Sequence, residues 1–165
     1  MIARGQASAG RLALVLAPLI LAAGVLSGRL SQSGPGNGWF DALVKPGFYP
    51  PPATFGIAWS VLYVLMGIAL ALVVAAPRSP VRRAAIAAFA VQLALNLAWS
   101  PLFFAAHRIA AALALLLAID VAVALTLVLF RRVRAAAGWL LAPYLAWVLF
   151  ATALNLAILR LNPGA

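Results

Sequence analysis

The stretch "IAAALALLLAIDVAVALTLVLF", residues 109–130, contains a single charged side chain, Asp120. A membrane-spanning helix needs about 20 consecutive apolar residues, so this run predicts one span. Four similar runs lie at residues 12–28, 54–76, 83–104 and 137–159. Short charged or proline-rich breaks join the last four runs, and breaks this short place neighbouring helices antiparallel. We therefore predict an all-α membrane protein, a five-transmembrane-helix bundle forming one domain over residues 1–165.

The composition supports a membrane protein and excludes several other classes. Of the 165 residues, 67% are hydrophobic and 8% are charged, whereas soluble domains are roughly half apolar and about a quarter charged. The excess of 12 Lys and Arg over 2 Asp and Glu normally lies in the loops of a membrane protein, so we expect no nucleic-acid partner. Because the chain has no cysteine, disulfides, thiol catalysis and thiolate metal sites are excluded.

The basic residues are unevenly divided between the two ends of the predicted bundle. The end that holds the N-terminus has eight: Arg4, Arg11, Arg78, Arg82, Arg83, Arg131, Arg132 and Arg134. The other end has four: Arg29, Lys45, Arg108 and Arg160. The positive-inside rule then predicts a cytoplasmic N-terminus in the cell membrane, with an outer membrane as the alternative. The first run, preceded by basic residues, also fits a signal peptide.

Standard catalytic groups are scarce. The two carboxylates, Asp41 and Asp120, are placed too differently to predict an acid–base pair. His107 has no His, Cys or Glu at metal-ligand spacing and is expected to anchor a helix end at the membrane interface. We therefore expect no enzymatic activity, no metal and no cofactor. Asp120 lies within a predicted span, so a functional role and a structural one both stay open.

Aromatic and amide side chains recur at helical spacing in three of the runs. The three stripes are Trp59, Tyr63 and Met66; Gln92, Asn96, Trp99 and Phe103; and Tyr144, Trp147, Ala151 and Asn155. Amides facing lipid are costly, so these stripes should face the bundle interior. Packing explains any one stripe, but three together favour a site for a flat apolar ligand with a few polar edges.

A second stripe on the 83–104 run consists of small residues, Ala90, Ala94 and Ala98. Small residues at this spacing allow another helix to approach closely. Because this stripe lies roughly opposite the amide stripe, we predict a homodimer interface there.

The long first loop, residues 29–53, contains "WFDALVKPGFYPPP" (39–52). Its prolines should prevent regular helix over 46–52, and Gly47 permits a tight turn. The aromatic side chains would not stay free in water, so the loop should fold back onto the mouth of the bundle. We expect a semi-rigid lid with Lys45 as a candidate anion contact; a merely structural cap is the alternative.

Three motifs, "WFDALVKPGFYPPP" followed by "FGIAWSVLYVLMG", "QLALNLAWSPLFF" and "PYLAWVLFATALN", resemble the TspO/MBR family in order and spacing. This family includes translocator proteins, tryptophan-rich sensory proteins and peripheral-type benzodiazepine receptors. The resemblance covers residues 12–161 and favours a retained first helix over a signal peptide. It implies five transmembrane helices, a loop closing over a ligand pocket, and commonly a homodimer. Family members bind porphyrins such as protoporphyrin IX, sterols and benzodiazepine-type ligands.

Through these motifs, the resemblance implies that ten residues of this chain line a ligand pocket. They are Trp39, Phe48, Trp59, Tyr63, Asn96, Trp99, Tyr144, Trp147, Ala151 and Leu154. One departure concerns "LNLAILR": Leu156 stands where the family's sterol motif has an aromatic residue, while Arg160 is retained. In some family members, an aromatic residue at that position is also credited with a role in light-dependent porphyrin breakdown.

The resemblance therefore implies a membrane receptor or carrier for tetrapyrroles, in transport or stress-linked regulation. The alternatives are a light-dependent porphyrin-degrading enzyme and a sterol-binding protein. A coupled secondary transporter is less expected, because the chain shows no internal repeat.

Overall fold

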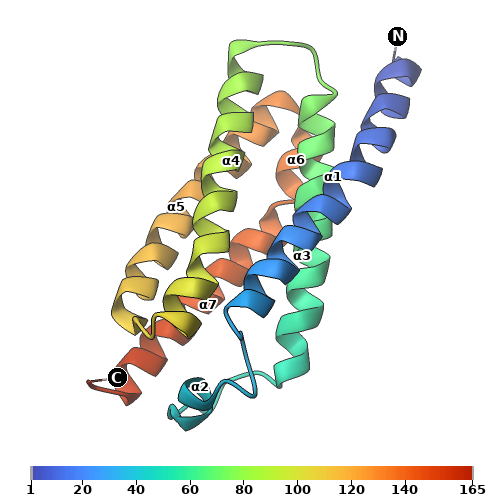
Figure 1. The fold of residues 1–165 in the computed structure, drawn as a ribbon. Helices are drawn as coiled ribbons and strands as arrows, with labels where there is room; N and C mark the ends of the chain where they lie inside the picture. The colour runs from blue at the N-terminus through green and yellow to red at the C-terminus, as the bar shows by residue number, and fades with distance from the viewer. Residues whose placement is uncertain (1, 165) are drawn as a thin grey trace.

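The computed structural model describes residues 2–164, and the side chains of residues 9–164. Its elements are α1 (Ile2–Leu30), α2 (Gly38–Ala42), α3 (Pro52–Val74), α4 (Pro80–Ser100), the π-helical turn η1 (Pro101–Ala105), α5 (Ile109–Val133), α6 (Ala135–Trp139) and α7 (Ala142–Leu161). Five helical segments are long and apolar enough to cross a membrane. They form one bundle, shown in Figure 1, which confirms the predicted all-α membrane fold.

The first span packs closely along the second. Gly67 on α3 lies against Ala17 on α1, where a Cβ on the glycine would overlap the alanine backbone. Further along, the ring of Tyr63 fills the space beside Gly24. At both places α1 and α3 come this close because glycine has no side chain. α1 is therefore an integral helix of the bundle.

The third predicted run, residues 83–104, ends in a wider turn than expected. α4 passes into η1 at Pro101, and the backbone N–H of Ala106 donates to the carbonyl of Pro101 at 2.9 Å. A proline has no N–H for the α-helical ladder, and a π turn is one way to accommodate it without ending the helix. The chain therefore continues to Ala105 with a local change of register.

The last predicted run, residues 137–159, lies within one candidate span, Ala135–Leu161, but its helix is interrupted. The chain forms α6, turns at residues 140–141, and starts again as α7 at Ala142. Pro143 lies in the first turn of α7, where its missing N–H leaves no helical hydrogen bond unmade. In the middle of one continuous helix the same proline would have broken the ladder.

The first loop runs from residue 31 to 51 and contains one short helix that was not predicted. Asn37 caps α2, its Oδ1 accepting from the backbone N–H of Phe40 at 3.1 Å. The predicted non-helical range of 46–52 is one residue too long, since Pro52 begins α3. Proline is well suited to that first helical position because its φ is already helical.

The first loop packs against the end of the bundle where the C-terminus lies (Figure 1). Its Phe40 and Leu43 are buried in an aromatic cluster with Phe103 and Phe104. Two asparagines attach it: Asn37 Nδ2 donates to the carbonyl of Phe104 at 3.2 Å. Asn162, at the end of α7, accepts from the N–H of Val44 at 2.8 Å and donates to its carbonyl at 2.9 Å.

The two groups of basic residues lie at opposite ends of the bundle. The connections α3–α4 and α5–α6 share one end with the start of α1, and Arg82 there donates to the last carbonyls of α3, Val73 and Val74. Arg4 lies outside the described side chains. Which end faces the cytoplasm stays a prediction.

Candidate ligand-binding site

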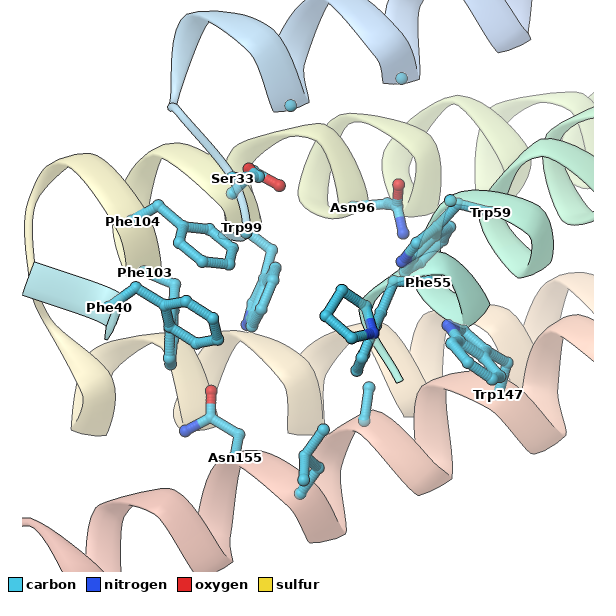
Figure 2. Close-up of a pocket in the computed structure, with 18 of the residues that line it drawn as sticks. Ser33, Phe40, Phe55, Trp59, Asn96, Trp99, Phe103, Phe104, Trp147 and Asn155 are labelled. Carbon is cyan, nitrogen blue, oxygen red and sulfur yellow. The ribbon is translucent and has the colours of Figure 1, made fainter. Parts of the chain in front are cut away.

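A cavity of about 400 Å³ lies inside the half of the bundle next to the first loop. Helices α1, α3, α4, α5 and α7, the η1 turn and the loop all contribute to its wall. Figure 2 labels ten of the lining residues: Ser33, Phe40, Phe55, Trp59, Asn96, Trp99, Phe103, Phe104, Trp147 and Asn155. Its volume is within the range of small-molecule sites, roughly 300–1,000 Å³.

The structure brings seven of the ten predicted pocket residues to this wall. They are Trp59, Tyr63, Asn96, Trp99, Trp147, Ala151 and Leu154. They come from three helices that the sequence stripes had placed facing inward. Whether they bind a ligand stays a prediction.

The other three predicted pocket residues do not line the cavity. Trp39 stacks on His107, with ring centroids 4.4 Å apart, and so joins the loop to the α4–α5 connection. Phe48 is 54% exposed and borders a separate outer groove beside α7. Tyr144 is fully buried behind the wall, where its hydroxyl donates to Gln92 Oε1 at 2.9 Å. In this conformation a ligand in the cavity would not touch these rings.

Flat aromatic faces dominate the wall. Trp59 stacks on Tyr63 with centroids 5.3 Å apart, and Trp99 stacks on Phe103 at 5.0 Å. Trp147 meets Phe55 edge to face at 5.9 Å. Rings fixed against each other in this way present rigid surfaces for an apolar ligand.

A few polar groups interrupt the apolar wall. The hydroxyl of Tyr63 donates to Asn96 Oδ1 at 2.9 Å, and Figure 2 shows the amide nitrogen of Asn96 on the cavity side. Asn155 Nδ2 donates to the carbonyl of Ile109 at 3.1 Å. Within the described part of the chain, Asn155 Oδ1 and Trp99 Nε1 are buried without a hydrogen-bond partner. An unpaired buried polar group costs about 1–3 kcal/mol, so a ligand that reached either atom would gain affinity.

Lys45 is placed in a structural role in this conformation. Its Nζ donates to the carbonyls of Phe40 at 2.7 Å and Leu43 at 3.0 Å, and lies 4.6 Å from the ring centroid of Phe40. A third, longer hydrogen bond of 3.3 Å reaches the carbonyl of Asp41. The ammonium therefore caps the C-terminal end of α2, where a positive charge is favourable. Contact with an anion would require it to leave these carbonyls.

Asp120 does not line the cavity and is half-buried. Thr152 on α7 donates to its Oδ2 at 2.8 Å, and the wall residues Ile119 and Ala151 are the preceding neighbours of this pair. The hydrogen bond joins α5 to α7. The other carboxylate oxygen, Oδ1, is buried without a hydrogen-bond partner among the described residues, so a structural and a functional role both stay open.

Tyr49 brings a neutral hydroxyl from the loop to the cavity rim. Burial raises the pKa of its phenol above the ordinary value, and the nearby carboxylate of Asp41 raises this pKa further. Tyr49 therefore adds no charge to the site.

Sequence reasoning predicted that the loop contributes to the pocket, but it named other loop residues, and it missed α1. Gly24 and Gly28 of α1 carry no chemical signal of a binding site. Phe40 and Phe55 lie within the quoted motifs but were not among the predicted pocket positions. Phe104 was missed because the π turn at Pro101 rotates the helix, so two consecutive phenylalanines face inward. Only the proline itself signalled that irregularity.

The fold and this site define a five-span membrane protein with an internal aromatic pocket, and comparison with known proteins gives its family. The model of the TspO/MBR family matches residues 14–161. Protein CrtK of Rhodobacter capsulatus is 42% identical over 127 residues, which cover 76% of this chain and 79% of the relative. Tryptophan-rich protein TspO of Chlorobaculum tepidum is 39% identical over 146 residues, covering 88% and 92%. The human translocator protein is 39% identical over 133 residues, covering 79% of each. The chain belongs to the TspO/MBR family, as its motifs predicted.

Proposed function

We propose that this protein is a non-enzymatic membrane receptor or carrier that binds a tetrapyrrole, such as protoporphyrin IX, in the cavity. The observation that carries this proposal is the pair of stacked aromatic walls, Trp59 with Tyr63 and Trp99 with Phe103. A macrocycle is flat and apolar with polar edges, and these rings would hold its faces. Its role would lie in tetrapyrrole transport or stress-linked regulation.

The carboxylates of such a ligand would lie toward the first loop. The basic residues at that end are Arg29, Lys45, Arg108 and Arg160. A charge-assisted contact with a carboxylate is about twice as strong as a neutral hydrogen bond. Arginine is the better candidate than Lys45, whose ammonium already has carbonyl partners.

Titration of the purified protein with protoporphyrin IX, followed by tryptophan fluorescence, tests the proposal. Trp59, Trp99 and Trp147 line the cavity, so saturable quenching is expected in the dark. The porphyrin absorption band should stay intact under illumination. Absence of saturable quenching would mean that tetrapyrroles are the wrong class of ligand.

The enzymatic alternative has a separate readout in the same experiment. Loss of the porphyrin band that requires both protein and light would indicate degradation. Leu156, where an aromatic ring is expected for that chemistry, borders the outer groove and not the cavity. Electron transfer through position 156 is therefore not supported, because the residue there has no aromatic ring and does not line the cavity.

A sterol is the second candidate ligand, at a different place. The outer groove beside α7 is lined by Phe48, Ala153, Leu156, Ala157, Arg160 and Leu161. Phe48 from the loop brings an aromatic ring beside Arg160, although position 156 itself is aliphatic. If a sterol binds there, Phe48→Ala should weaken sterol binding and leave porphyrin binding unchanged.

We also infer that the N-terminus is cytoplasmic, so that the first loop faces the opposite compartment; an outer membrane remains the alternative location. The division of basic residues supports this orientation. Because the chain has no cysteine, Gly47→Cys would carry the only thiol. An impermeant thiol reagent added outside intact cells should label it, and labelling only after lysis would reverse the orientation.

A further inference from the structure

Helices α1 and α3 do not seal the cavity along their whole length. They are in close contact at Ala17 and Gly67, and again where Tyr63 fills the space beside Gly24. Closer to the loop, Figure 1 shows the two helices diverging. A Cβ built on Gly56 of α3 meets no other atom within 4 Å. Space is therefore open next to the cavity at this level.

Several residues near this opening line the cavity and also have a high exposed fraction. They include Val25 of α1, which is 43% exposed, and Gly56 and Ser60 of α3. A residue with both properties lies on the rim of an opening. Gly28 of α1 lines the cavity at the same level. Small side chains thus form much of this rim.

The opening lies within the candidate membrane span of α3, Pro52–Val74. Gly56 and Ser60 stand about 6 and 12 Å along α3 from its first residue, at 1.5 Å per residue. Ile57 and Val61, which flank them on the outside, are 67% and 52% exposed. On a predicted membrane span, large apolar side chains that are exposed lie against lipid.

The opening extends to the ends of the first loop, where Ser33, Pro35 and Pro52 line the cavity and are exposed. Under α2 the end of the cavity is closed. The loop buries Phe40 and Leu43 there, and Asn37 and Asn162 hold it by hydrogen bonds to Phe104 and Val44. Entry from water on the α2 side would require these contacts to break.

We propose that hydrophobic ligands enter and leave the cavity directly from the bilayer, through a lateral opening between α1 and α3 rimmed by Val25, Gly28, Gly56 and Ser60. This inference rests on the proposed function, because it concerns the route of the same ligand. A flat apolar molecule concentrates in the membrane before it binds, so a lateral route shortens its path. The small rim residues set the width of that route.

Gly56→Leu tests this route, because the added side chain enters open space and should not disturb packing. In vesicles, stopped-flow quenching by protoporphyrin IX should show association and dissociation rate constants that both fall about tenfold. The matched control is Ala53→Leu, one turn earlier on α3, which is exposed and does not line the cavity. It should leave both rate constants unchanged.

A reversible block strengthens the test, since the natural chain has no cysteine. Once a bulky disulfide-forming reagent is attached to Ser60→Cys, this variant should bind and release porphyrin more slowly than before the attachment, and reduction should restore its earlier rate constants. Ile57→Cys, on the adjacent lipid-facing position, is the control for the reagent.

The possible outcomes separate the route from the function. Unchanged rate constants in both blocked proteins would overturn the lateral route while leaving the receptor proposal intact. Faster dissociation with unchanged association would make position 56 a wall contact and would equally overturn the route. If the unmodified protein fails to bind protoporphyrin IX, the proposed function itself is wrong.

Discussion

At the scale of the residue, Trp99 combines three properties of the pocket. Its ring stacks on Phe103, it lines the cavity, and its Nε1 is buried without a partner among the described residues. It follows Asn96 at helical spacing, which is why the sequence could predict it. Trp39 shows where such reasoning stops: its motif position predicted a pocket residue, but stacking on His107 holds it outside. That contact depends on two segments far apart in the chain.

Replacing Trp99 by alanine should weaken protoporphyrin IX binding by about 1–2 kcal/mol, because a stacking surface is lost. Trp99→Phe should recover most of this loss if stacking dominates, and little of it if the indole N–H donates to the ligand. Equilibrium titration of both variants measures the difference. Trp139→Ala is the control, since this exposed residue lies at the other end of the bundle. Unchanged affinity in a folded Trp99→Ala protein would remove Trp99 from the site.

At the scale of the element, the spans were predictable and their irregularities were not. Apolar runs located the helices because length and composition suffice to define a membrane span. The π turn at Pro101 and the break before Pro143 were missed, since a proline only disfavours a regular helix. Whether the chain widens, kinks or restarts depends on packing against other helices. The helix in the first loop was missed for a related reason: five residues carry too little periodicity to be recognised.

The first loop offers a prediction at this scale, because Asn162 holds the backbone of Val44 with two hydrogen bonds. Asn162→Ala should loosen the loop by about 1–2 kcal/mol. Hydrogen exchange at the Val44 amide measures this, and it should become faster. Asn162→Asp keeps the acceptor for that amide and loses the donor, so it should give an intermediate rate. Equal exchange in all three proteins would mean that the loop is held by its buried phenylalanines alone.

At the scale of the whole molecule, one face of α4 is left without a partner in the single chain. Ala90, Ala94 and Ala98 are all exposed there, while the opposite side of α4 buries Phe89, Gln92 and Asn96. The sequence stripes predicted this division, and it supports the proposal of a homodimer through the alanine face. A face of small residues in a membrane allows two helices to approach closely.

A bulky side chain on this face should disturb such a dimer. Ala94→Phe should shift the protein toward monomer in detergent by about tenfold in the dissociation constant, as measured by light scattering or crosslinking. Val121→Phe is the control, because Val121 is 71% exposed on a different helix, α5. Porphyrin binding should survive in both variants, since neither position lines the cavity. A dimer that persists in Ala94→Phe would place the interface elsewhere.

The wide turn at Pro101 has a consequence for how this chain can vary in length. A π turn holds one residue more than an α turn, so deleting one residue between Pro101 and Ala105 would restore ordinary helical winding. Because the wider turn has already absorbed that extra residue, the residues after it would keep the faces they have now. Phe104 would still contact Phe40, and its carbonyl would still accept from Asn37. In lineages that share this turn, a one-residue deletion there should therefore need no matching change in the first loop.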